Sequence, residues 1–179
     1  MERIRGVSPR FKARMAGGLY VFSVLTAIFF ELFLRGRMGY AANFIQMSGM
    51  AAVTLLCYSI FKAGNKSLSL LAAFFNLVGL TFEAFRLSPY GVNMAVVFHG
   101  VFCILIGYLI FRSTFLPRIL GVLMAFAGLS WLTFLLTSLA NHLSPYNLAC
   151  GLIGEAPVFL WLLVMGVNVP LWKEQAACG

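Results

Sequence analysis

Residues 92–111 read VNMAVVFHGVFCILIGYLIF, twenty positions without a charged side chain. A helix of about 20 apolar residues is long enough to cross the hydrocarbon core of a bilayer. Similar stretches separated by turn residues lie on both sides of this one. We therefore predict an all-α integral membrane bundle of six transmembrane helices, at residues 17–34, 41–61, 68–87, 92–111, 118–139 and 148–169.

The composition excludes most other classes of protein. The chain has 179 residues, of which 61% are hydrophobic and only 10% are charged, whereas soluble domains carry about 25% charged residues. So few charges cannot cover a water-facing surface, which argues against a cytosolic enzyme, a secreted domain or a disordered chain. We expect one membrane domain, residues 17–169, between a basic cytoplasmic arm, residues 1–16, and a short cytoplasmic tail, residues 170–179.

The basic residues predict the direction of the spans. Cytoplasmic loops carry an excess of Lys and Arg, and the six spans divide these residues ten to three. We therefore place the protein in the cell inner membrane, with both termini in the cytoplasm. Because the basic residues lie next to span ends, we expect membrane lipids as partners and no nucleic acid. The larger group is Arg3, Arg5, Arg10, Lys12, Arg14, Lys62, Lys66, Arg112, Arg118 and Lys173, and the smaller is Arg35, Arg37 and Arg86.

Polar side chains gather in the outer half of the predicted bundle. Glu31 and Glu83 lie near the outer ends of their spans, and Gln46 enters the second span from the same side. His99 and Glu155 each lie seven residues into a span, which is a depth of roughly 10 Å. The pattern indicates a polar pocket that opens away from the cytoplasm.

Glu155 is the strongest candidate for a catalytic role. An ionisable group inside a membrane costs about 2.5–3.5 kcal/mol, and no basic residue lies within four positions of Glu155. We expect a proton donor or hydrogen-bond anchor, with His99 or Arg86 as its partner across the bundle. His99 itself is a candidate for acid–base work, for a hydrogen bond to a neighbouring helix, or for a metal ligand.

Arg86, Glu83, Glu31 and Gln46 are the candidate binding residues. Glu83 and Arg86 stand three positions apart, which places them on one face of a continuous helix. They either form an ion pair at the interface or hold an anionic head group or phosphate. Glu31, one turn before Arg35, leaves the same alternatives open.

The cysteines predict no metal site. None of the four belongs to a C-x-x-C pair, and buried single cysteines behave as small hydrophobic residues. His99 likewise has no partner in the sequence at a spacing typical of metal ligands. We therefore expect no metal and no cofactor. The cysteines are Cys57, Cys103, Cys150 and Cys178.

Gly121, Ala125 and Gly128 recur at intervals of four and three on the fifth span. Small residues at this spacing let two helix backbones approach closely in a membrane. The partner helix is either a neighbour in the same chain or a second subunit, as in a homo- or hetero-oligomer.

Several stretches resemble one bacterial family of multi-pass membrane proteins, a domain of unknown function. They are GYLIFRSTFLPRILGVL at 107–123, Gly154-Glu155 followed by LWLLVMGV at 160–167, SPRFKAR at 8–14 and Phe85-Arg86-Leu87. The resemblance implies a six-span fold and places Glu155 and Arg86 on positions of the family pattern. The pattern has a histidine where this chain has Phe102 or Cys103, so His99 departs from it. The resemblance implies no chemistry.

Three functions fit these patterns. The first is a small enzyme or binding protein for an apolar ligand of the lipid or isoprenoid class, and whether it catalyses a reaction stays open. The alternative is a non-catalytic accessory or regulatory subunit of a membrane complex, packing through the fifth helix. The third is a transporter, which the dry inner half of the bundle disfavours.

Overall fold

The computed structural model describes residues 7–33 and 37–178, with the backbone alone at residues 30–33, 37–42, 90 and 178. The predicted all-α class is confirmed, since these residues form helices and no strand. The helices are α1 (Pro9–Phe33), α2 (Arg37–Phe61), α3 (Lys66–Ala84), η1 (Pro89–Gly91), α4 (Met94–Arg112), α5 (Arg118–Leu132), η2 (Thr133–Leu135), α6 (Thr137–Leu143), α7 (Tyr146–Val164) and α8 (Val169–Cys178).

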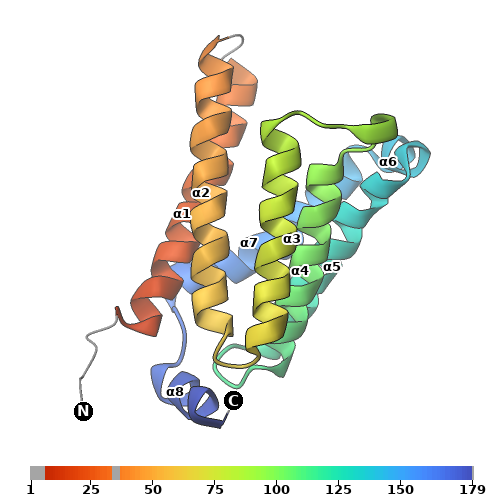
Figure 1. Ribbon diagram of the computed structural model, residues 1–179. Coiled ribbons are helices and arrows are strands. Elements are labelled where there is room, and N and C mark those ends of the chain that lie inside the picture. Colours follow the sequence, from red (N-terminus) through yellow and green to blue (C-terminus); the bar gives the residue numbers. More distant parts are fainter. Residues whose placement is uncertain (1–6, 34–36, 179) are drawn as a thin grey trace.

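The long helices form two groups that meet where α2 packs against α3 and that α7 also joins. Helix α1 packs along α2, α3 packs against α4, and α4 packs against α5, while α7 contacts both α1 and α5. In Figure 1 the α1–α2 hairpin spreads away from α3 and α4 at the end opposite the chain termini, and α7 crosses behind both groups. The bundle therefore narrows toward the end where α8 lies.

Polar side chains close the bundle at the end that holds the termini. The Arg14 guanidinium donates to the carbonyl of Val164 at 3.0 Å, and Arg10 donates to Met165 at 3.3 Å. These two arginines satisfy carbonyls that the end of α7 leaves without a helical partner. From α8, the Trp172 indole donates to the carbonyl of Ile60 at 2.8 Å.

Helices α4 and α5 approach most closely at glycines. A Cβ atom added at Gly121 would lie 2.6 Å from the carbonyl oxygen of Gly107, and one added at Gly107 would lie 2.7 Å from the backbone nitrogen of Ala125. Gly128 meets Gly100 and Ile104 in the same way. The predicted small-residue face is thus buried against α4 of the same chain, and it is not available as the seam of a dimer.

The outside of the bundle is apolar. Large side chains such as Phe22, Phe44, Leu25 and Phe74 are more than half exposed, whereas Glu155 is 1% exposed. Five helices of the described residues are long and apolar enough to cross a membrane: Asn43–Phe61, Lys66–Ala84, Met94–Arg112, Arg118–Leu135 and Tyr146–Val164. An apolar exterior around buried polar groups is the arrangement that a lipid surrounding favours.

Several helix boundaries differ from the predicted spans, and α7 ends at Val164 rather than near residue 169. Helix α1 begins at Pro9 rather than near residue 17, which adds two turns at the terminal end. The predicted third span ends early, at Ala84. The predicted fifth span, 118–139, is not one helix, because α5 ends at Leu132 and α6 follows after η2.

A polar link explains the break after α5. The Thr133 hydroxyl donates to the carbonyl of Ser130 at 2.7 Å, and the Ser130 hydroxyl donates to the carbonyl of Asn147 at 2.6 Å. The buried Asn147 amide donates in turn to the carbonyl of Ala140 at 3.3 Å. Side chains that bond to nearby backbone compete with helical hydrogen bonds, so the chain turns here and starts α7 against α5.

Candidate functional site

A cavity of about 600 Å³ lies between the α1–α2 hairpin and helices α3, α4, α5 and α7. Five of the six residues predicted for catalysis or binding line it: Gln46, Glu83, Arg86, His99 and Glu155. The sixth, Glu31, lies in α1, but its side chain falls outside the described part. The cavity runs from the loop after α3 to a buried floor at the middle of α7.

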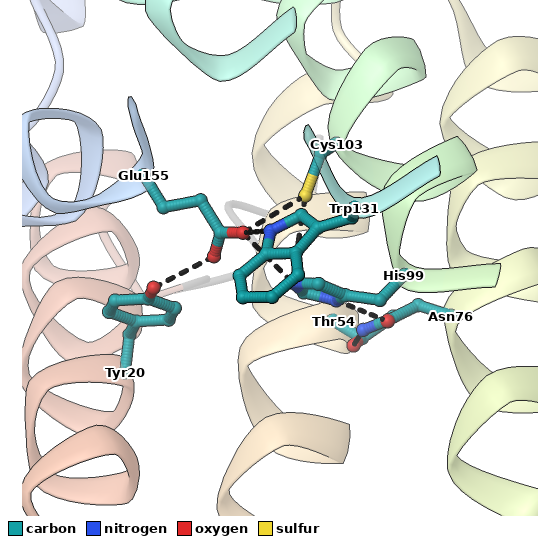
Figure 2. A network of polar contacts seen from close by, with 7 residues as sticks. All are labelled: Tyr20, Thr54, Asn76, His99, Cys103, Trp131 and Glu155. Carbon is teal, nitrogen blue, oxygen red and sulfur yellow. Dashed lines mark hydrogen bonds and ion pairs between the residues drawn. The ribbon is translucent and has the colours of Figure 1, made fainter. Parts of the chain in front are cut away.

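Glu155 is the centre of that floor (Figure 2). The Tyr20 hydroxyl donates to its Oε2 atom at 2.7 Å, and the Trp131 indole N–H donates to its Oε1 atom. His99 Nε2 lies 3.1 Å from the same Oε1. Residues from α1, α4, α5 and α7 therefore meet at one carboxyl group. The Tyr20 ring also stacks on Phe159 with centroids 3.8 Å apart, which holds the hydroxyl in place.

A chain of hydrogen bonds fixes the orientation of the His99 ring. The Thr54 hydroxyl donates to the carbonyl of Met50 at 2.7 Å, so its oxygen accepts from the Asn76 amide nitrogen at 2.6 Å. The Asn76 oxygen then faces His99 Nδ1 at 2.9 Å and accepts a hydrogen bond from its N–H. Asn76 is buried, with 2% of its surface exposed.

This chain leaves one proton to be placed between His99 and Glu155. With Nδ1 protonated, the Nε2 of a neutral His99 carries a lone pair. That lone pair faces an oxygen of Glu155, which is an acceptor in the carboxylate form. A proton shared by the two groups, or another cation, must therefore lie between them, and the floor is built to hold one.

Cys103 adds a third donor atom to this point. Its Sγ lies 3.4 Å from Glu155 Oε1 and 3.6 Å from His99 Nε2. Ligand atoms of His99, Cys103 and Glu155 all lie within 4.8 Å of one another. Cys103 was not predicted as a partner of His99. The signal was present, since a spacing of four residues puts both side chains on one face of α4.

Arg86 lies at the other end of the cavity, and its predicted place on a helix face shared with Glu83 was wrong, because α3 ends at Ala84. The N–H of Arg86 donates to the carbonyl of Glu83 at 3.0 Å, and the N–H of Leu87 donates to that of Phe82 at 2.9 Å. This is the Schellman end of α3, with Arg86 at φ 51° where glycine is usual. Both side chains nevertheless line the cavity, so Arg86 reaches it from a left-handed turn and not from a helix face.

Tyr20, Asn76 and Trp131 complete the floor and were not predicted. Tyr20 stood near the inner end of the predicted first span, but the earlier start of α1 places it eleven residues into the helix. A buried Trp N–H usually needs an acceptor, and an Asn inside an apolar span does too. These needs are visible in the sequence, but which residues satisfy them depends on helix rotation.

The fold and the site together define a multi-pass α-helical membrane protein with a polar cavity. Residues 85–166, from the end of α3 to just past α7, match the family described as Domain of unknown function (DUF4386). The predicted resemblance is confirmed for this stretch, which contains His99, Cys103, Trp131 and Glu155 but neither Tyr20 nor Asn76. No curated protein and no solved structure matches the chain.

Proposed function

We propose that the protein binds an amphiphilic small molecule of the lipid or isoprenoid class in this cavity. The observation that carries the proposal is that one cavity joins Arg86 and Glu83 at one end to the Glu155 floor at the other. Its volume of about 600 Å³ lies within the range of small-molecule sites, roughly 300–1,000 Å³. Apolar residues such as Ile28, Leu80 and Val96 supply most of the wall between the two ends.

The two ends of the cavity take different parts of the ligand. Arg86 offers a guanidinium, whose planar set of donors suits a phosphate or carboxylate head group. Glu155 and His99 belong to the floor, which anchors a polar atom at the other end of the ligand. A ligand of this kind enters from the membrane or from its surface.

We further propose six spans with both termini in the cytoplasm of a bacterial inner membrane. Helix α1 has 25 residues, as many as α2, and packs along its length, so it crosses wherever α2 does. The helix ends nearest the termini carry Arg10, Arg14, Lys62, Arg112 and Arg118, as the positive-inside rule requires of a cytoplasmic face. The cavity then opens on the opposite side.

Mass spectrometry of the protein purified in mild detergent tests the ligand proposal. We expect one defined amphiphile to be enriched in the wild type and depleted about tenfold or more in Arg86→Ala and Glu155→Gln, a loss of at least about 1.4 kcal/mol of binding. Arg112→Ala is the matched control, because Arg112 is a basic residue at the far end of α4. Bulk phospholipid alone in every preparation would contradict the proposal.

The accessory-subunit alternative depended on a free small-residue face on the fifth helix, and that face is already buried. The Gly121–Gly128 face packs against α4, so a partner protein has to use another surface. The same purification separates the two functions, since a stoichiometric partner protein without a ligand favours the alternative.

A further inference from the structure

We propose that His99, Cys103 and Glu155 form a binding site for a single zinc-like divalent metal ion at the cavity floor. The proposal deepens the proposed function, because it names what the floor presents to a ligand. The cysteine spacing had predicted no metal site, because Cys103 pairs with a histidine and a glutamate rather than with a second cysteine. Four observations support the proposal: the spacing of the donor atoms, the orientation of the histidine, the balance of charge and access from the cavity.

The donor atoms are spaced as a tetrahedral ion requires. Bond lengths of about 2.0–2.1 Å to nitrogen and oxygen and about 2.3 Å to sulfur give ligand separations of roughly 3.3 Å for nitrogen to oxygen and roughly 3.6 Å for either to sulfur. The observed separations are 3.1 Å from His99 to Glu155, 3.6 Å from Cys103 to His99 and 3.4 Å from Cys103 to Glu155. One nitrogen, one sulfur and one oxygen donor form a set that suits Zn²⁺.

The neighbouring residues already orient these ligands. Metal-binding histidines almost always donate their other ring N–H to an oxygen, and His99 Nδ1 faces the Asn76 oxygen at 2.9 Å. The lone pair on Nε2 is thereby turned toward the cluster. Tyr20 and Trp131 hold the Glu155 carboxyl group through its two oxygens.

Charge favours an ion at this place. A divalent cation with one thiolate, one carboxylate and a neutral imidazole has no net charge, which suits a site surrounded by apolar helices. The ion also replaces the proton that must otherwise lie between His99 Nε2 and Glu155 Oε1, because both atoms can then bind through lone pairs.

The site keeps a position open to the cavity. Cys103 is fully buried, but His99 and Glu155 line the cavity and the His99 side chain is 19% exposed. Water or a ligand oxygen can therefore supply the fourth donor, as in zinc sites that act as Lewis acids. The ligand class that such a site recognises carries an oxygen at its buried end.

Metal analysis of the full-length protein in detergent tests the proposal. The protein is stripped with a chelator, loaded with Zn²⁺ or Co²⁺ in the absence of added lipid and desalted. We expect about one metal ion per chain and, for Co²⁺, the near-ultraviolet absorption band of a cobalt–thiolate bond. Wild type that retains no metal, or cobalt protein without the thiolate band, overturns the proposal whatever the variants do.

Variants identify the ligands and their support. Cys103→Ser is expected to remove the thiolate band, while Cys57→Ser, at a second fully buried cysteine outside the cluster, retains it. Asn76→Leu is expected to weaken metal binding about 10–100-fold through the His99 ring. Equal metal affinity in wild type and Cys103→Ser overturns the site.

The same preparation separates this proposal from the proposed function. Arg86→Ala is expected to keep the metal and lose the amphiphile, because Arg86 lies at the far end of the cavity. Metal without any enriched amphiphile leaves the site standing and refutes the lipid ligand, whereas an amphiphile without metal does the reverse.

Discussion

The two sides of helix α4 are packed in very different ways. On one side it packs against α5, where Gly100, Gly107, Gly121 and Gly128 bring the two backbones into contact. On the other side it packs against α3 and faces α1 and α2 across the cavity, which His99 lines. Both sides are made from apolar spans, so hydrophobicity does not distinguish them. The distinction lies in residue size on one side and in paired polar groups on the other.

The comparison separates two ways of holding helices together in lipid. Since lipid tails are as apolar as Leu, apolar side chains gain little from leaving them, and helices associate by close packing or by hydrogen bonds. The α4–α5 contact uses the first. The floor uses the second, through Glu155 and its contacts with Tyr20, Trp131 and His99. We therefore expect substitutions at the two kinds of contact to lower the free energy of unfolding by different amounts.

The largest effect is expected at the glycine contact. In Gly121→Ala the new Cβ would lie 2.6 Å from the Gly107 oxygen and 2.7 Å from the Phe111 nitrogen, which are backbone atoms that cannot move aside cheaply. We expect a loss of about 2–3 kcal/mol in the free energy of unfolding, although alanine is the better helix former by about 1 kcal/mol. Denaturant titration in mixed micelles measures it.

Gly18→Ala is the control for that measurement. Its Cβ would meet only the Leu163 Cδ1 atom at 3.6 Å, an ordinary contact. We expect no loss, or a gain of up to about 1 kcal/mol. Equal losses at both positions would show that close approach of α4 and α5 is not what glycine provides at position 121.

The next effect is expected at the floor. Tyr20→Phe removes the hydroxyl that donates to Glu155 Oε2 but keeps the ring that stacks on Phe159. Because the carboxyl oxygen is left buried and without this donor, we expect a loss of about 1–3 kcal/mol. The same micelle titration measures it.

Tyr108→Phe tests whether the loss comes from the floor. Tyr108 lies on α4 and is 49% exposed, so we expect a change within about 0.5 kcal/mol. A comparable loss in both variants would mean that the Tyr20 hydroxyl contributes nothing through Glu155.

The depth of the floor was predictable from the sequence, but its membership was not. His99 and Glu155 were placed at one depth by counting residues from the same end of two spans, and their side chains lie 3.1 Å apart. Counting works because the rise per residue of a helix is constant. It says nothing of rotation about the helix axis, which decides whether Asn76 turns toward His99 and Trp131 toward Glu155.

The ends of helices were the least predictable part. Hydropathy marks where a chain can lie in lipid but not where its backbone stops being helical, so the extension of α1 to Pro9 was missed and Tyr20 with it. The end of α3 is set by two backbone hydrogen bonds around Arg86. The apolar pattern of the sequence does not indicate these bonds, so Arg86 was predicted to lie on a helix face.

The smallest effect is expected at Arg86, where backbone and side chain can be separated. A residue with a Cβ pays about 1–2 kcal/mol in the left-handed region that Arg86 occupies at φ 51°, and glycine does not. Arg86→Gly and Arg86→Ala both remove the guanidinium, so their difference isolates the backbone. We expect the glycine variant to be the more stable by about 1 kcal/mol, less the entropy that glycine adds to the unfolded chain. Thermal unfolding of the two variants side by side measures it.

If both variants also lose the amphiphile equally, the guanidinium binds the head group and the turn only presents it. Retention of the amphiphile in the glycine variant alone would instead assign that role to the shape of the turn.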